Sequence, residues 1–396
     1  MAKYSYNEKK KSLIITLIAI LLVIVCLISV LVSYKVNKNA LFENQDLARA
    51  VASALGKRPN ELDEESLGRI EVLYLSKDST TGLPIVSLGY DTLFHYLSID
   101  PDSEEYNEKE VTEGVNNNTY SAYMSYSFSD VSDLKLFKGL KFLYLQGFSS
   151  VKTLDFISSM KNLEMLSIGS TMIDDISALS EFKSIKTLDI TNLGLTDISV
   201  LESLVDLEGL SVDKNPIKDF SVIEKLTKLK TFSFSECEVE DMSFIKDLTN
   251  LTSINFSTNK ISDLSPLKNL SSLKSIYGAD NKINDISHLD GLKKVNTLML
   301  NNNEIVDISS VKSMINIEYL TLSNNKIKDV TPIAELTKMK YLYLDNNEIE
   351  DISMLKHFDK NSFVMCNLTG NKIPDDGWEV MDKYSSTYIY GKPSKK

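Results

Sequence analysis

The side chains that most often carry out catalysis are few and scattered in this chain of 396 residues. The three histidines, His95, His288 and His357, stand far apart, and none belongs to an H-E-x-x-H motif. The sequence also contains neither a glycine-rich phosphate loop nor a nucleophile elbow. We therefore predict no catalytic residues, no metal site and no cofactor, and we expect a binding protein rather than an enzyme.

The cysteines suggest no chemistry either. Cys26, Cys237 and Cys366 are an odd set without C-x-x-C spacing, so neither a zinc site nor a disulfide framework is indicated. The charge balance excludes another class of partner: 43 Lys and Arg against 55 Asp and Glu give a net charge of −12. Nucleic-acid binding needs clustered basic residues rather than an acidic surplus, so we expect no nucleic-acid partner.

An apolar segment near the N-terminus predicts a membrane anchor. Leu13–Val32 contains no charged residue, and at about 1.5 Å per residue it is long enough to cross the hydrocarbon layer as a helix. Lys9–Lys11 precede it, and the positive-inside rule then places residues 1–12 in the cytoplasm and the remainder outside the cell. Cleavage as a signal peptide and lipid attachment at Cys26 are weaker alternatives, because the apolar run is long and Val25 is not a small residue. We predict a transmembrane helix over 13–34 and a lipid bilayer as its partner.

Residues 163–358 repeat with a period of 22, which gives nine units. Two apolar residues with one residue between them, such as Leu320 and Leu322, predict a short strand in each unit. A second apolar segment follows in each unit and begins with Ser or Thr, twice followed by Pro. This is an N-cap and first-turn pattern, so a short 3₁₀ turn is expected there. These Ser and Thr residues are Ser177, Ser199, Ser221, Ser243, Ser265, Ser287, Ser309, Thr331 and Ser353.

Two polar positions complete each unit. An Asp stands two residues before every Ser or Thr, and an Asn follows the strand in six of the nine units. Both side chains can hydrogen-bond nearby backbone groups and so satisfy a tight turn. A calcium ladder is the alternative for the Asp residues, although one carboxylate per unit supplies few of the oxygens that Ca²⁺ needs. The six Asn residues are Asn215, Asn259, Asn281, Asn303, Asn325 and Asn347, and Cys237 takes the same place in another unit.

The pattern L-x-x-L-x-L-x-x-N-x-I-x-D-I-x-x-L resembles the leucine-rich repeat of bacterial internalins. The resemblance implies an α/β solenoid, a horseshoe with short parallel strands on the concave face and short helical (3-10) turns on the convex face. An apolar stripe from Phe42 to Leu55 is similar to the helical N-terminal cap of that family. We therefore expect a cap and first strand over 39–75, an irregular insertion over 76–130, repeats over 131–374 and a C-terminal cap over 375–396.

Stacked repeats leave a continuous concave sheet for partners, so the outward strand positions define the expected site. In the first five units these residues are mostly small and polar, whereas the last four carry four tyrosines and a methionine. Such residues are enriched in interface cores, although Tyr also suits an exposed strand position. The predicted ligand-binding residues are Tyr277, Met299, Asn301, Tyr319, Tyr341, Tyr343 and Asp345.

These observations predict a membrane-anchored extracellular protein that binds a protein ligand through the concave strands, as an adhesin or receptor. A glycan ligand is a second option. An envelope scaffold or sensor, coupled to a membrane partner through Leu13–Val32, is the alternative function. An enzyme with its site in 76–130 is a third, disfavoured because this segment is short and has no recognisable acid–base pair.

Overall fold

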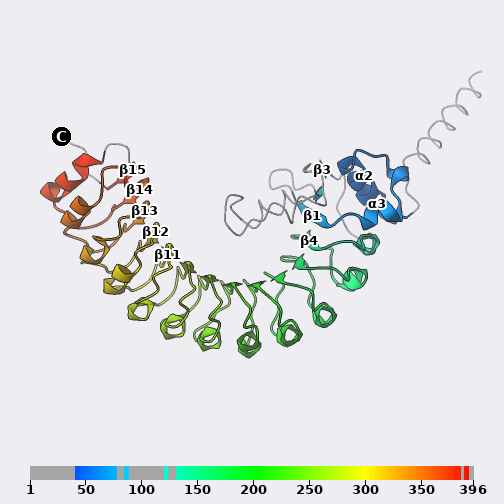
Figure 1. Cartoon of the computed structure of the whole chain (residues 1–396), viewed down its shortest axis with the longest axis horizontal. Helices are drawn as coiled ribbons and strands as arrows, with labels where there is room; N and C mark the ends of the chain where they lie inside the picture. The colour runs from blue at the N-terminus through cyan, green and yellow to red at the C-terminus, as the bar shows by residue number, and fades with distance from the viewer. Residues whose placement is uncertain (1–40, 78–83, 89–119, 124–130, 385–387, 392–396) are drawn as a thin grey trace, which may run out of the picture. The chain divides into compact units, whose positions relative to one another are not determined.

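The computed structural model describes residues 41–77, 84–88, 120–123, 131–384 and 388–391 (Figure 1). The predicted cytoplasmic tail 1–12 and the predicted span 13–34 lie outside these residues. Within the described ranges, no helix is both long and apolar enough to cross a membrane. The chain divides into two compact units, one with residues 1–143 and 155–160 and the other with 144–154 and 161–396.

The first unit begins with a capped amphipathic helix. The Asn44 side chain accepts hydrogen bonds from the backbone N–H groups of Asp46 and Leu47, which satisfies the first turn of α2. The buried Asp133 carboxylate accepts from the N–H groups of Glu43 and Asn44, at 3.0 and 2.6 Å. The helices of this unit are α2 (Gln45–Ala54), η1 (Pro59–Glu61), α3 (Glu64–Gly68), η2 (Ser132–Leu136) and η3 (Asp155–Ser159).

The segment that the sequence predicts as an irregular insertion contains two strands. β1 (Val72–Lys77) pairs antiparallel with β2 (Pro84–Leu88), which pairs antiparallel with β3 (Tyr120–Tyr123). The expectation of an irregular segment over 76–130 is therefore corrected at these positions. The 22-residue period begins only after this segment, at residue 163, so the repeat pattern that reveals the other strands gives no signal here.

The second unit is a solenoid with one short strand per coil. Neighbouring strands are parallel and in register, so that Leu298, Leu320 and Leu342 lie side by side. The strands are on the concave side of the arc and the 3₁₀ turns on its convex side (Figure 1). β4 (Phe142–Leu145) falls at the boundary of the two units. The strands that follow are β5 (Met165–Ser167), β6 (Thr187–Asp189), β7 (Gly209–Ser211), β8 (Thr231–Ser233), β9 (Ser253–Asn255), β10 (Ser275–Tyr277), β11 (Thr297–Met299), β12 (Tyr319–Thr321), β13 (Tyr341–Tyr343), β14 (Met365–Asn367) and β15 (Tyr388–Tyr390).

The convex turns form where the Ser and Thr residues predict them, but the cap is a different residue. Ser177 is the first residue of its 3₁₀ turn, and Asp175 Oδ1 accepts its N–H at 2.8 Å. The same contact recurs from Asp197 to Asp351, so the Asp two residues earlier serves as the cap. The turns are η4 (Ser177–Glu181), η5 (Ser199–Ser203), η6 (Ser221–Lys225), η7 (Ser243–Ile245), η8 (Ser265–Leu267), η9 (Ser287–Leu289), η10 (Ser309–Ser313), η11 (Thr331–Ile333), η12 (Ser353–His357) and η13 (Asp375–Lys383).

The recurrent Asn side chains join each coil to the one before it. Asn325 Nδ2 donates to the carbonyls of Leu300 and Leu322, at 3.0 Å in both cases, and its Oδ1 accepts the N–H of Ile305 at 2.9 Å. These backbone groups are buried and have no strand partner, so the amide provides the hydrogen bonds that they require. This confirms the role that the sequence predicts for the Asn residues, and we call the set the asparagine ladder.

The core changes character between β8 and β10. Phe232, Phe234 and Phe256 point inward from β8, β9 and the residues after them, and their rings are almost fully buried. A Cβ at Gly278 would lie 2.3 Å from a ring carbon of Phe256, closer than any real contact. This explains why Gly278 interrupts an otherwise apolar repeat position: the phenylalanine of the preceding coil already fills the space.

Candidate functional site

The outward side chains of the sheet form three columns, each with one residue per coil. Taken at β12, the columns contain Tyr319, Thr321 and Ser323. Because the strands pair in register, each residue lies beside its equivalent in the neighbouring coil, about 4.8 Å away. All seven residues predicted as ligand-binding lie in these columns and are half-buried. The concave face therefore presents them as a surface rather than as a closed pocket.

Three of the predicted tyrosines come together on β12 and β13. Tyr319 lies opposite Tyr341, and their rings stack with centroids 4.0 Å apart and planes 18° from parallel. Desolvation and the hydrogen bond to Tyr341 raise the pKa of the Tyr319 phenol above its ordinary value. The Tyr343 hydroxyl donates to Met365 Sδ at 2.7 Å. Because these side chains are already held in place, they lose little side-chain entropy when a partner contacts them.

Two residues that the sequence does not single out extend this cluster. Met365 lies opposite Tyr341 on β14, and Tyr390 on β15 shares the column of Tyr343, with Asn367 between them. Tyr390 is 47% exposed, which makes it one of the most exposed large apolar side chains among the described residues. Met365 and Tyr388 follow their predecessors by 24 and 23 residues, so a strict 22-residue period misses β14 and β15. We define the tyrosine patch as Tyr319, Tyr341, Tyr343, Met365 and Tyr390.

The other predicted residues lie on the same face but outside this cluster. Tyr277 and Met299 are neighbours across β10 and β11, and Thr321 separates them from Tyr343 in the same column. Asn301 Oδ1 accepts from the Thr321 hydroxyl at 3.1 Å. Asp345 lies in the same column as Asn301, two coils further along. Its Oδ1 accepts from the Ser323 hydroxyl at 2.5 Å, and its Oδ2 accepts from the Asn346 side chain at 3.1 Å. The predicted residues therefore fall into the tyrosine patch and two separate groups, Tyr277 with Met299 and Asn301 with Asp345.

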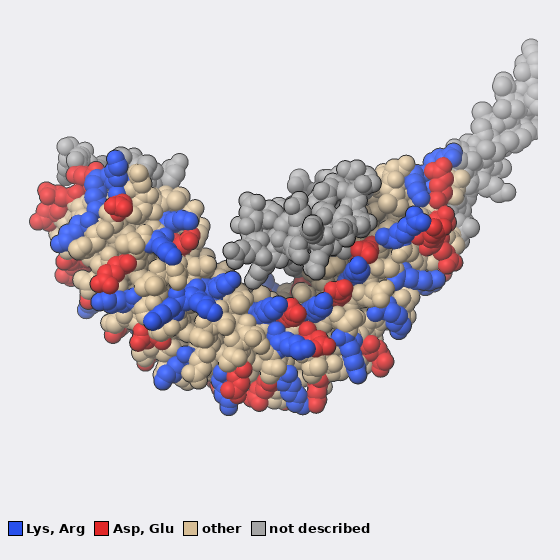
Figure 2. All heavy atoms as spheres, in the orientation of Figure 1, with Lys and Arg blue, Asp and Glu red and all other residues tan. Residues whose placement is uncertain are grey.

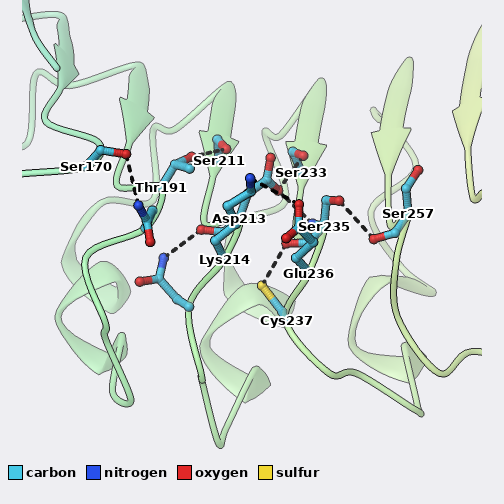
Figure 3. A network of polar contacts seen from close by, with 12 residues as sticks. Ser170, Thr191, Ser211, Asp213, Lys214, Ser233, Ser235, Glu236, Cys237 and Ser257 are labelled. Atoms are coloured by element: carbon cyan, nitrogen blue, oxygen red, sulfur yellow. Dashed lines mark hydrogen bonds and ion pairs between the residues drawn. The ribbon is translucent and has the colours of Figure 1, made fainter. Parts of the chain in front are cut away.

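The concave surface of β5–β9 is polar and lined by hydroxyl groups (Figure 3). Asp213 Oδ1 accepts from the Ser233 hydroxyl and the Ser235 N–H, both at 2.6 Å. The buried Asp189 accepts from the Ser167 hydroxyl at 2.8 Å. Burial raises the pKa of the Asp213 carboxyl, and the nearby Asp189 charge adds to this effect. We call this part the hydroxyl region.

The cysteine thiols in the described part of the chain are poor nucleophiles. Burial raises the pKa of Cys237 to about 11 and that of Cys366 to about 12, so both thiols are protonated at neutral pH. The Cys237 thiol contacts the carbonyls of Val212 and Ser235, at 3.3 and 3.4 Å, in the place of a ladder asparagine. His288 and His357 lie in different convex turns, η9 and η12. Within the ranges that the structure describes, no group of three or more His, Cys, Asp or Glu residues could hold a metal ion.

Charge is distributed unevenly between the flanks and the concave face. Basic and acidic residues are interspersed over the face seen in Figure 2. Pairs between neighbouring coils include Lys230–Glu208 and Lys340–Glu318, 2.8 and 2.7 Å apart. From β5 to β14 the three concave columns contain no Lys or Arg. The charged residues in these columns are Asp189, Asp213 and Asp345.

Comparison with known proteins agrees with this architecture. A family model described as "Leucine Rich repeats (2 copies)" matches residues 227–269 and 315–357. An internalin (InlF) from Listeria monocytogenes is 24% identical, with a TM-score of 0.68, over 90% of this chain and 97% of that one. The Arabidopsis receptor kinase HAESA, solved with the peptide hormone IDA and the co-receptor SERK1, is 17% identical, with a TM-score of 0.50, over 61% and 44% of the chains. No curated protein sequence matches this chain.

Proposed function

We propose, on the premise that this chain is a leucine-rich-repeat protein of internalin-like fold, that it binds a protein ligand at the bacterial cell surface through the tyrosine patch. The leucine-rich-repeat fold is a scaffold for protein–protein interaction. Binding is an equilibrium recognition event without covalent chemistry, in the manner of an adhesin or receptor.

The observation that supports the patch most strongly is the stacked pair Tyr319–Tyr341 beside Tyr343 and Met365. Aromatic and Met side chains that are rigid and half-exposed are typical of interface hot spots. A strand position that only needed a residue suited to β-structure would accept Thr, which occupies the equivalent sites Thr187, Thr231 and Thr297. The remaining concave strands show that the fold does not require aromatic residues here.

Surface display is part of the proposal and rests on the sequence of residues 1–38. The apolar segment Leu13–Val32, preceded by Lys9–Lys11, supports an N-terminal membrane anchor with the repeats outside the cell. The alternative function, an envelope scaffold or sensor, uses the same concave face but adds a membrane partner that contacts the anchor. Replacing Leu13–Val32 by an unrelated apolar span distinguishes the two, because only the scaffold or sensor loses its partner.

The test of ligand binding is a crosslinking capture with the full chain in native membranes and in candidate host-cell extracts. The variant Tyr319→Ala/Tyr341→Ala removes the stacked pair, and Thr231→Ala/Ser253→Ala changes two exposed or half-buried positions in the first column of the hydroxyl region. We expect both variants to fold, because none of the four side chains belongs to the buried core. Circular dichroism and thermal unfolding verify that each variant is folded before capture.

The proposal predicts a partner that the parent protein and the Thr231→Ala/Ser253→Ala variant capture and that the tyrosine variant loses. Equal capture by all three proteins would place recognition elsewhere on the molecule. Capture of carbohydrate instead of protein would replace the protein ligand by a glycan. Surface display is checked separately by treating intact cells with protease, and repeats that survived this treatment would contradict it.

A further inference from the structure

We infer that the partner presents a basic segment to the concave face, with an arginine seated on the tyrosine patch next to Asp345. This inference rests on the proposed function, because it assumes that the concave face is the binding surface. It adds the chemistry of the partner, which the aromatic residues alone do not specify.

The first argument is the sign of the charge on the concave face. Lysines are plentiful on the flanks, yet the three concave columns from β5 to β14 contain carboxylates as their only charged groups. Several flank lysines are paired with acidic residues of neighbouring coils, as in Lys186–Glu164 and Lys326–Glu304. A partner that approaches the concave surface therefore meets an unbalanced negative charge, which favours positive side chains and disfavours acidic ones.

The second argument is the position of Asp345 beside the aromatic rings. Tyr343 and Asp345 point to the same face of the sheet, separated by the buried Leu344. They are close enough for the carboxylate to raise the pKa of the Tyr343 phenol, together with desolvation as the largest cause. A carboxylate has about four sites that can accept hydrogen bonds, and Ser323 and Asn346 occupy one on each oxygen. Asp345 can therefore accept further donors from a partner.

Arginine fits this arrangement better than lysine. Its planar guanidinium stacks on a tyrosine ring while its N–H groups donate to a carboxylate, whereas the lysine ammonium is compact and strongly hydrated. Asp213 lies in the same column as Asp345, six strands away, which corresponds to about 29 Å at about 4.8 Å per strand. An extended segment of about nine residues covers this distance at about 3.3 Å per residue. A peptide of twelve residues can therefore contact both carboxylates.

The experiment is a selection of random twelve-residue peptides displayed on phage, with the full chain as bait. The enriched peptides are then synthesised, and their affinities are measured by fluorescence anisotropy for the parent protein and for Asp345→Asn. Asp359→Asn is the matched control, since it also removes one negative charge, in the exposed segment after η12 and outside the three columns. Lysine is substituted for each arginine of the best peptide to separate geometry from charge.

We expect enrichment of arginine, and about a tenfold weaker affinity for Asp345→Asn, with little change for Asp359→Asn. Enriched peptides without basic residues would overturn the inference and leave the proposed function in place. Equal losses in the two Asp variants would show that overall charge, and not Asp345, selects the peptide. A selection without any enrichment would also overturn the inference, and the capture experiment would then decide the proposed function by itself.

Discussion

The hydroxyl region and the tyrosine patch have the same backbone plan but differ in what they present on either side of the sheet. Both are built from three-residue parallel strands in register. The hydroxyl region has small polar side chains outside, and towards its end phenylalanines fill the core, as with Phe234 and Phe256. The tyrosine patch has its aromatic rings outside, over Leu320 and Leu342 in the core of β12 and β13, whereas Phe358, Phe363 and Tyr384 pack together in the core of the last coils.

This difference separates what the fold requires from what it only permits. Inward positions must be filled without overlap, and the ring of Phe256 in one coil is therefore matched by Gly278 in the next. Outward positions carry no such constraint, because Thr, Ser, Gly and Tyr all occupy equivalent sites in the first column. An aromatic cluster on the outward side therefore points to recognition, whereas one on the inward side is packing.

The largest effect is expected from the asparagine ladder. Asn325→Ala leaves the N–H of Ile305 without its side-chain partner and removes one of the two amide donors to each of the Leu300 and Leu322 carbonyls, which keep Asn303 and Asn347. We expect this to cost about 3 kcal/mol of unfolding free energy. Thr171, at the equivalent position in the first coil of the hydroxyl region, makes a single side-chain hydrogen bond, to the Ile168 carbonyl. Thr171→Ala should therefore cost only about 1 kcal/mol. Urea unfolding measures both free energies. Equal losses would show that the Asn325 amide contributes no more to stability than the Thr171 hydroxyl does.

The boundary between the two kinds of core can be tested at Gly278. Gly278→Ala places a methyl group 2.3 Å from a Phe256 ring carbon, and we expect the overpacking to cost about 2 kcal/mol. Phe256→Leu should remove most of this penalty in the double variant, because the ring is the cause.

Gly209→Ala is the comparison within the hydroxyl region. Its Cβ would meet the ends of the Thr231 and Thr187 side chains, at 3.0 and 3.3 Å, and these can move. We therefore expect a cost well below that of Gly278→Ala. If thermal unfolding showed that the effects of Gly278→Ala and Phe256→Leu simply add in the double variant, this would contradict the packing explanation for Gly278.

A smaller effect in the opposite direction is expected at Cys237. Cys237→Asn introduces an amide where the neighbouring coils have Asn215 and Asn259, so this coil gains the ladder contact that it lacks. We expect about 1 kcal/mol of additional stability, seen as a higher melting temperature. Cys237→Ala, which removes the thiol without adding an amide, should instead lower the melting temperature. A destabilised Cys237→Asn would show that this coil has adapted its backbone to the sulfur atom.

The smallest effect is a dependence on pH that has opposite signs at two aspartates. Burial raises the pKa of Asp213, so its contribution to stability is fully present below about 3.8 and is lost as pH rises through the folded-state value. Hydrogen bonds from Ser265 lower the pKa of Asp263, so its contribution is present above 3.8 and is lost as pH falls. The free energy of unfolding of Asp213→Asn, relative to that of the parent, should therefore be higher at pH 7 than at pH 3.5. For Asp263→Asn the same difference should be lower at pH 7 than at pH 3.5. Urea unfolding at the two pH values tests the sign, and parallel changes would contradict it.

The repeat pattern predicts much of the solenoid because each coil repeats the same physical requirements. Strand positions, buried leucines and the role of Asn325 follow from period and residue type alone. The pattern predicts Ser177 as the cap of its 3₁₀ turn instead of Asp175, because a pattern does not show which of two nearby polar residues closes a tight turn. It does not indicate Met365 and Tyr390, because the spacing changes at the end of the array. The strands β2 and β3 have no repeat to reveal them.

The asparagine ladder also has a consequence for how such a protein evolves. Each ladder amide bonds only to its own coil and the one before it, and Asn371, in the coil after the last ladder residue, likewise reaches back to the Leu344 carbonyl. Duplication or deletion of a whole coil therefore leaves the ladder contacts intact and changes the length of the concave face by about 4.8 Å. A gene that gains or loses segments of 66 base pairs, the coding length of one 22-residue coil, can adjust the distance between its two chemically different surfaces without redesigning either.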